Sequence, residues 1–228
     1  MPMRLKATLI AALAAVFLLA ASASAAMVGI YRNGMDTTGQ RGQLLKLSGK
    51  ECARGGSESA LKVTLGKATP ECSYRTPVIG RNMEIGATER LLSTTPKPSQ
   101  HGAYLGLAAR AGGNARFELR VFPLQRKVQL LKIVSSEITY LAIDKNEKAV
   151  MGLNKANALR LRVVNGSEKG KVQVTGYLGN ATVVEATDES GGASLPGQFS
   201  GISLGALKSP NGVAGSYDDV LVRVPVRF

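Results

Sequence analysis

Several segments of the chain alternate apolar and polar residues, with turn-forming residues between them. The period-two pattern is clearest in five segments, at 103–112, 115–122, 158–166, 171–178 and 220–228. Successive side chains of a β-strand point to opposite sides, so each segment is predicted to be a strand. One face of each strand would then meet a core, and the other would meet solvent or a ligand.

Clusters of Gly, Pro, Asn, Asp and Ser separate these strands. They occur at 111–114, 144–148, 165–170, 188–192 and 209–212. Such residues favour turns, and a turn every 10 to 20 residues or so is typical of a sandwich or barrel. Helical periodicity is weak, and only short helical turns are predicted, over 60–68 and 85–93.

The best candidate for an internal break is "TTPKPSQHG", residues 94–102, where two prolines stand in a polar run. Neither side of this break would bury a large core alone, because short chains leave much of their surface in water. We therefore expect 94–102 to be a loop within one domain that spans residues 27–228.

The N-terminal segment has the pattern of a secretory signal peptide, assigned to residues 1–26. Arg4 and Lys6 precede an apolar run, and Ala23-Ser24-Ala25 supplies the small residues of a cleavage site. A membrane anchor is the alternative, but the apolar run is shorter than the roughly 20 residues that a spanning helix needs. The protein is thus predicted to be secreted, with no membrane span after cleavage.

The chain is strongly basic, with 29 Lys and Arg against 16 Asp and Glu and a formal net charge of +13. Such a charge attracts polyanions, so an anionic polysaccharide or cell-envelope polymer is the predicted partner. Charge spread evenly for solubility is the alternative. No recognition helix or aromatic stacking platform is evident, which argues against specific nucleic-acid binding.

Both cysteines, Cys52 and Cys72, lie in the exported part and are predicted to form a disulfide. A metal pair is disfavoured, because His101 is the single histidine of the sequence and no C-x-x-C spacing occurs. No cofactor is expected. His101 lies in the Pro-rich loop without an identifiable catalytic partner, so it is interpreted as an ordinary loop residue.

Arginines lie opposite the apolar residues of the predicted strands. If some of those strands are adjacent, the guanidinium groups would form a cationic face suited to carboxylate, sulfate or phosphate. An ordinary solvated sheet face is the alternative. The candidate ligand-binding residues are Arg116, Arg120, Arg160, Arg162 and Arg223, with Arg227 in the same pattern.

The order of these segments resembles a known architecture. "YLGLAAR", "RFELRVF", "LRLRVVNG", "VQVTGYLGN", "GQFSGISLG" and a closing "GSYDDVLVRVP" follow one another, as in concanavalin A-like jelly rolls of the laminin-G type. The chain is also similar to secreted actinobacterial proteins of this architecture with no assigned activity. The resemblance covers about residues 80–228 and implies an all-β, two-sheet antiparallel β-sandwich.

Departures from this resemblance bear on activity. The glucanase-like enzymes of the fold share an E-x-D-x-x-E strand, which is absent here. The alginate-lyase-like enzymes carry an R-x-E strand and a Q-[IV]-H strand, for which the chain offers only "QHG" at 100–102. A non-catalytic module for an anionic glycan is therefore the leading hypothesis. A polysaccharide hydrolase or lyase, and a structural envelope protein that binds another protein, are the alternatives.

Two adjacent carboxylates, Asp218 and Asp219, precede the last strand. Neighbours on a strand point to opposite faces, with Asp218 expected on the side of Val220 and Asp219 on that of Leu221. They cannot by themselves form a glycosidase pair, which needs two carboxyl groups facing one bond. Glu118 is the distant acid considered as a partner. Calcium at Asp218–Asp219 or at Asp188–Glu189 is a further alternative.

Overall fold

The computed structural model describes residues 26–57, 59–67, 69–112, 114–190, 195, 197–207 and 212–226. Apart from Ala26, the predicted signal peptide lies outside these residues, as does Arg227. Over the described ranges, no helix is both long and apolar enough to cross a bilayer.

The described residues form fifteen strands and two short helices. In chain order these are β1 (Met27–Asn33), α1 (Thr38–Gly42), β2 (Leu45–Ser48), β3 (Cys52–Ser57), β4 (Ala60–Leu65), β5 (Glu71–Ile79), β6 (Met83–Leu91), α2 (Lys97–Gln100), β7 (Ala103–Gly112), β8 (Ala115–Phe122), β9 (Lys127–Val134), β10 (Glu137–Asp144), β11 (Asn157–Asn165), β12 (Val172–Leu178), β13 (Ala181–Asp188), β14 (Phe199–Ala206) and β15 (Val213–Pro225).

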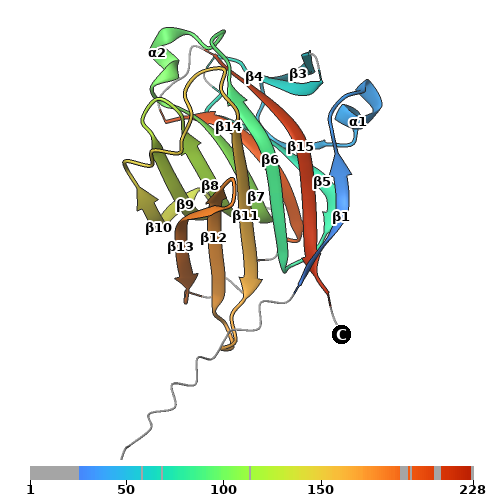
Figure 1. Cartoon of the computed structure of the whole chain (residues 1–228), viewed down its shortest axis with the longest axis vertical. Helices are drawn as coiled ribbons and strands as arrows, with labels where there is room; N and C mark the ends of the chain where they lie inside the picture. Colours follow the sequence, from blue (N-terminus) through green and yellow to red (C-terminus); the bar gives the residue numbers. More distant parts are fainter. Residues whose placement is uncertain are drawn as a thin grey trace, which may run out of the picture.

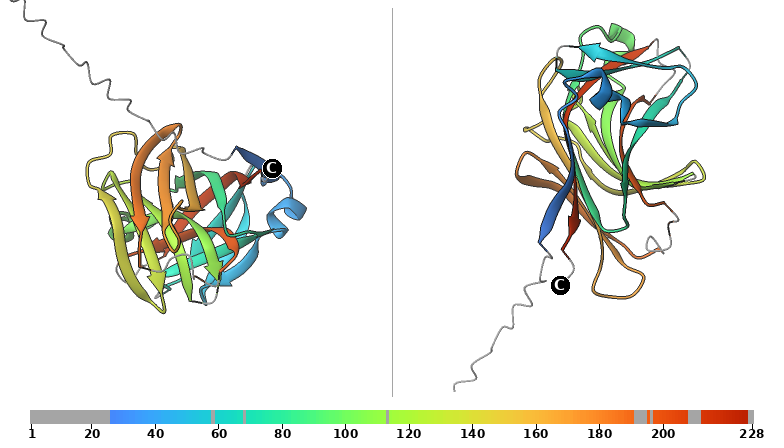
Figure 2. Two further views of the ribbon diagram at one scale, coloured as in Figure 1. Left: turned by 90° about the horizontal axis from the view of Figure 1, so that it is seen from below. Right: turned by 90° about the vertical axis from the view of Figure 1, so that its right-hand side faces the viewer.

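Two antiparallel sheets pack face to face as a β-sandwich of the jelly-roll type (Figures 1 and 2). Sheet A has the order β13-β12-β11-β6-β15-β4-β3, and β1 also pairs with β15. Sheet B has the order β10-β9-β8-β7-β14-β5-β2. The predicted fold class is therefore confirmed.

The core lies between the sheets and is filled by every second residue of most strands. Leu105 and Leu107 of β7 meet Leu159 and Leu161 of β11 in one cluster of buried side chains. The intervening residues, such as Tyr104 on β7, point to the opposite face of their sheet. Within the described residues, all five segments with clear alternation lie on strands, as predicted.

The two predicted helical turns were wrong. Residues 60–65 form β4 and residues 83–91 form β6, which lies in the middle of sheet A. Leu61, Val63 and Leu65 alternate into the core, as do Met83 and Ile85. Period-two burial therefore prevails over the weak helical spacing.

The last strand lies inside its sheet, not at an edge. β15 pairs with β6 on one side, and with β4 and then β1 on the other. Its register shifts between Asp218 and Leu221, and Asp219 has a positive φ of 49°. Tyr217 and Val220 are both in the core, so this bulge breaks the alternation. The expectation that Asp218 shares a face with Val220 was wrong.

Residues 94–102 connect β6 of sheet A to β7 of sheet B and contain the short helix α2. The hydroxyl of Thr95 donates to the carbonyl of Ala214 at 3.1 Å and accepts from the Ala214 amide at 2.9 Å. The loop is thus attached to the first residues of β15. The core cluster holds residues from both sides of this loop, among them Ile85 and Leu105.

The predicted disulfide is present between Cys52 and Cys72. Cys52 begins β3 at the edge of sheet A, and Cys72 is the second residue of β5 in sheet B. The bond therefore joins the two sheets covalently. It also fixes the backbone beside Glu71, the residue that precedes Cys72.

Candidate ligand-binding site

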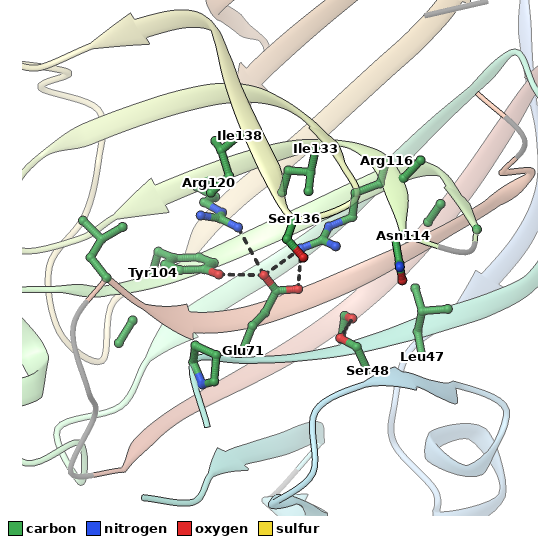
Figure 3. Close-up of a pocket in the computed structure, with 17 residues that line it drawn as sticks. Leu47, Ser48, Glu71, Tyr104, Asn114, Arg116, Arg120, Ile133, Ser136 and Ile138 are labelled. Carbon is green, nitrogen blue, oxygen red and sulfur yellow. Dashed lines mark hydrogen bonds and ion pairs between the residues drawn. The ribbon is translucent and has the colours of Figure 1, made fainter. Parts of the chain in front are cut away.

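A pocket of about 430 Å³ opens on the face of sheet B that points away from sheet A (Figure 3). Ligand pockets of proteins commonly enclose about 300 to 1,000 Å³, so its size suits a small ligand or part of a larger one. The lining residues are Leu47, Ser48, Pro70, Glu71, Ser73, Tyr104, Ala111, Gly112, Asn114, Ala115, Arg116, Arg120, Ile133, Ser136, Ile138, Ala206 and Leu207. We call this site the sheet B pocket.

A network of ion pairs lies at the centre of the sheet B pocket. Nη2 of Arg116 lies 2.7 Å from each carboxylate oxygen of Glu71, and Nε of Arg116 donates to Glu118 at 3.1 Å. Nη2 of Arg120 donates to Glu71 at 3.1 Å and to Glu118 at 3.0 Å. The Tyr104 hydroxyl donates to Glu71 at 2.9 Å. Two guanidinium groups and two carboxylates thus balance each other in charge.

Alternation along the strands and two glycines explain why this network assembles. Arg116, Glu118 and Arg120 stand at every second position of β8, so all three point away from the core. A Cβ at Gly205 would lie 2.3 Å from the Tyr104 ring. A Cβ at Gly106 would lie 3.3 Å from Oε1 of Glu118 and closer still to a neighbouring serine hydroxyl. Glycine at both positions leaves room for the buried polar side chains.

The network shifts the pKa values of its two acids in opposite directions. Burial raises the pKa of Glu71, the charge of Glu118 raises it further, and the arginines reverse this only in part. Burial also acts to raise the pKa of Glu118, but Arg120 and Arg116 outweigh it and lower that pKa to about 2. Burial and both carboxylates raise the pKa of Tyr104 well above its ordinary value. Tyr104 is therefore a neutral hydrogen-bond donor at physiological pH.

One nitrogen atom of the Arg116 guanidinium group is available to a ligand. Its Nε and Nη2 are bound by carboxylates, whereas Nη1 makes no hydrogen bond within the described residues. Asn114 is exposed at the rim of the pocket. Ile133 and Ile138 form an apolar wall, and Tyr140, 53% exposed, follows Ile138 two residues along β10 on the same face. The pocket therefore combines fixed polar groups with apolar surface.

The structure divides the candidate arginines between two sites. Arg116 and Arg120 lie in the sheet B pocket, where each is paired with carboxylates. Arg160 and Arg162 of β11 and Arg223 of β15 belong to sheet A. The five residues therefore form two groups on different sheets instead of one cationic face.

Sequence reasoning missed Glu71, which comes from β5, and Tyr104, which comes from β7, the strand directly before β8. No local motif marks either residue, and only the pairing of β5, β14, β7 and β8 brings them together. One signal was readable and was overlooked. The expectation that the chain offers only "QHG" was wrong, because Arg116-Phe117-Glu118 has the R-x-E spacing, and both charged residues belong to the network.

The acids considered for calcium are engaged by cations. Asp188 lies 2.9 Å from Lys132, and Asp219 lies 3.5 Å from Arg32. Glu189 lies 2.8 Å from Lys171. Among the described residues, no group of three or more His, Cys, Asp or Glu could hold a metal ion. A calcium site stays a prediction.

His101 and Asp218 are not among the described residues that line the pocket. His101 is exposed, and its carbonyl accepts a hydrogen bond of 2.6 Å from the side chain of Gln125. A carboxylate oxygen of Asp218 accepts from the amide of Asp219 at 2.7 Å. Both aspartates lie within β15, at its bulge, so the expectation that they precede the strand was wrong.

Comparison with known proteins identifies the fold. No protein-family model and no curated protein sequence matches the chain. The carbohydrate-binding module CBM66 of Bacillus subtilis superposes with a TM-score of 0.56 at 13% identity, over 78% of this chain and 93% of that one. A galectin-like protein of unknown function from Bacillus subtilis gives 0.57 at 13%, over 88% and 98%.

An enzyme is also similar in structure. The kappa-carrageenase of Pseudoalteromonas carrageenovora, in complex with an oligotetrasaccharide of kappa-carrageenan, has a TM-score of 0.51 at 9% identity, over 92% of this chain and 100% of that chain. At such identities the likeness establishes a shared architecture and nothing about ligand or activity. The chain has the two-sheet jelly-roll fold that these glycan-binding, galectin-like and glycan-degrading proteins have in common.

Proposed function

We propose that the protein is a secreted, non-catalytic glycan-binding module that holds sugar residues in the sheet B pocket. The observation that carries this proposal is the ion-pair network of Glu71, Arg116 and Arg120 beside an apolar wall in one pocket. The structural neighbours include a carbohydrate-binding module, which supports the proposal by analogy.

Sugars present hydroxyl groups at the edge of the ring and C–H groups on its faces. Nη1 of Arg116 and the side chain of Asn114 would donate to hydroxyl oxygens. Ile133, Ile138 and the ring of Tyr140 would contact the C–H faces. Because the network holds Arg116 in place before a ligand arrives, binding would cost little side-chain entropy.

The carboxylates support binding over hydrolysis. A glycosidase needs two carboxyl groups that flank the scissile bond. Glu71 is the one acid among the described residues that line the pocket, and both of its oxygens are bound by Arg116. Glu118 has no exposed surface and is enclosed by Arg116, Arg120 and Ser203. The second carboxylate is therefore shielded from a substrate.

Secretion is part of the proposal and draws on two observations. The Cys52–Cys72 disulfide joins the two sheets, and such bonds persist in oxidising compartments. The N-terminal sequence has a signal-peptide pattern. Both agree with a ligand on a cell surface or in the extracellular matrix.

A polysaccharide lyase is the second candidate, favoured by the R-x-E spacing of Arg116, which lines the pocket, and Glu118, which is enclosed beneath it. Lyases need a base that removes a proton and a cation that stabilises the resulting anion. Arg116 could fill the second role. The raised pKa of Tyr104 makes that hydroxyl a poor base at neutral pH, so binding without turnover is preferred. Incubation with a polyuronate should yield no unsaturated product.

A glycan array, followed by titration calorimetry of its best neutral oligosaccharide, tests the proposal. Tyr140→Ala and Asn114→Ala should each weaken binding by about three- to tenfold, since each removes one contact at the pocket rim. Tyr177→Ala, on the far side of the sandwich, is the matched control and should bind as the wild type does. Equal effects of Tyr140→Ala and Tyr177→Ala, or no glycan bound at all, would refute the pocket as the site.

A further inference from the structure

Three arginines gather on the face of sheet A that points away from sheet B. Arg162, Glu84 and Arg223 are direct cross-strand neighbours, so they form one row over β11, β6 and β15, which run side by side (Figure 1). With about 4.8 Å between strands, the Cα atoms of Arg162 and Arg223 lie about 10 Å apart. Arg160 precedes Arg162 by two residues on β11 and therefore points to the same face.

This group carries more positive than negative charge. Nη1 of Arg223 donates to Oε1 of Glu84 at 2.5 Å, and Nη1 of Arg160 lies 3.6 Å from the same oxygen. Glu84 is nearly buried, whereas the side chains of Arg160 and Arg223 are 28% and 32% exposed. Two guanidinium groups thus contact one carboxylate, and a third arginine, Arg162, is its cross-strand neighbour. The next acid on this row, Glu185, lies two strands beyond Arg162.

Arg160 is held in position before any ligand binds. Its guanidinium carbon lies 4.4 Å from the centroid of the Tyr177 ring, which is a cation–π contact. Gly86 pairs with Arg160 across the strands, and a Cβ there would lie 3.0 Å from Cγ of Arg160. Glycine therefore lets the arginine lie flat across β6. A planar fork that is already ordered binds an oxyanion with little loss of entropy.

We propose that Arg160, Arg162 and Arg223 bind the phosphate or sulfate groups of an extracellular polyanionic glycan. Such groups present several oxygens and match the paired N–H donors of arginine. This site goes beyond the glycan pocket proposed above and does not depend on it, because the two lie on opposite faces of the sandwich.

The same face offers a second cationic contact, which favours a chain over a free ion. Arg90 lies six residues beyond Glu84 on β6, at a distance of about 20 Å along the strand. Ser216 of β15 pairs with both Arg90 and Lys62, so these two cations flank it. Asp218 lies close enough to Arg90 to interact with its charge, and so offsets part of the positive charge of this contact. A polymer chain that contacts both cationic groups at once would bind more tightly than a free ion, because the second contact forms within the same complex.

The experiment compares two doubly substituted proteins that lose the same charge. Arg160→Gln/Arg162→Gln removes two cations from the site and leaves the pair between Arg223 and Glu84 intact. Lys148→Gln/Lys155→Gln removes two exposed cations from the loop between β10 and β11. The probes are a dextran sulfate oligosaccharide and a polyribitol phosphate. Calorimetry gives Kd at about 50 mM and at about 300 mM NaCl. Because salt screens charges, the difference between the two Kd values measures the electrostatic contribution to binding.

The arginine variant should bind the preferred polymer about tenfold or more weakly, and the lysine variant less than about threefold. The affinity of the wild type for the polymer should fall as the salt concentration rises. The polymer that binds more tightly shows whether the site prefers sulfate or phosphate groups. Arg160→Lys/Arg162→Lys, which keeps the charge but not the fork, should lose affinity as well. A neutral oligosaccharide that occupies the pocket should bind all of these variants as it binds the wild type.

Three outcomes would overturn the inference. Equal losses in the arginine and lysine variants would mean that only total charge matters. Absence of binding to both polymers would remove the site. Equal affinity for a DNA duplex of matched charge, with the same loss in the arginine variant, would reassign the surface to nucleic acid. These three outcomes can be judged even if the sheet B pocket binds no glycan, because the pocket is tested with a neutral oligosaccharide and the arginine site with charged polymers.

Discussion

Glu71 and Glu118 are bound by the same nitrogen atom, Nη2 of Arg120, at 3.1 Å and 3.0 Å. They come from β5 and β8, between which β14 and β7 lie in the sheet. Only Glu71 lines the pocket, while Glu118 is enclosed beneath the arginines. One carboxylate therefore belongs to the surface that a ligand would meet, and the other holds that surface in shape.

The enclosed carboxylate should control stability in acid. The pKa of Glu118 is about 2 in the folded protein, below the ordinary 4.5. A lowered pKa contributes stability that is present above pH 4.5 and is lost as the pH falls towards 2. The lowered pKa corresponds to a contribution of about 3 kcal/mol to the free energy of unfolding. We expect urea unfolding at a series of pH values to show this loss in the wild type.

Glu118→Gln should weaken that acid dependence and should also lower the free energy of unfolding at pH 7, by about 3 kcal/mol. Two buried arginines would then face a single carboxylate. Glu185→Gln removes an exposed acid and serves as the control, with wild-type behaviour expected throughout. A Glu118→Gln profile that follows the wild type from pH 5 to pH 2 would contradict this assignment.

Glu89 should be a destabilising residue. It lies on β6 without exposed surface, and neither of its carboxylate oxygens has a hydrogen-bond partner among the described residues. Burial, and then the charge of Glu118, raise its pKa well above the ordinary value. Glu89→Met fills a similar volume without buried polar atoms. It should raise the free energy of unfolding at pH 7 by about 1 to 3 kcal/mol.

The pH dependence of the Glu89 effect has a defined sign. A raised pKa contributes stability that is fully present below the unfolded pKa and is lost as the pH rises through the folded pKa. Wild-type stability should therefore fall at high pH, and Glu89→Gln should flatten that decline. Denaturant curves at pH 5, 7 and 9 check this, and a Glu89→Met protein no more stable than the wild type would refute it.

The disulfide should affect both stability and the pocket. Its cysteines are 20 residues apart in sequence, which corresponds to about 3 kcal/mol in the chain-entropy model. Cys52→Ser/Cys72→Ser should lower the free energy of unfolding by about that amount. It should also weaken binding in the pocket, because Glu71 precedes Cys72. A reducing agent should reproduce both losses in the wild type and leave the variant unchanged.

Arg116 should set the polar geometry of the pocket. Arg116→Lys keeps the charge, but an ammonium group cannot bridge Glu71 and Glu118 with a planar fork. Affinity for the best neutral oligosaccharide should fall about tenfold, as measured by calorimetry. Arg126→Lys, in the exposed turn after β8, is the control and should leave Kd unchanged. Full affinity in Arg116→Lys would assign binding to the apolar wall alone.

The predictable part of the fold depends on alternation. β7, β8, β11 and β12 have apolar residues at every second position, and their limits agree with the sequence prediction to within about one residue. β6 was assigned to a helical turn because Gly86, Thr88 and Glu89 dilute its apolar pattern. Glu89 points inward against the pattern, so local periodicity could not identify this central strand.

The site was predictable only in part. Arg116 and Arg120 were candidates because they alternate with core residues on β8. Their partner Glu71 stands about 45 residues earlier in the chain, and its role depends on strand order, which alternation does not reveal. The same limit explains why Arg160 was grouped with Arg116, although their strands belong to opposite sheets.

Glycan binding in the sheet B pocket is tested most directly by a map of amide chemical shifts, recorded while the best neutral oligosaccharide is added to the labelled protein. We expect the perturbed amides to cluster on β5, β8 and β10, around Glu71, Arg116 and Ile138, with sheet A unaffected. Perturbations confined to sheet A, or scattered over both sheets without saturation, would contradict glycan binding in the sheet B pocket.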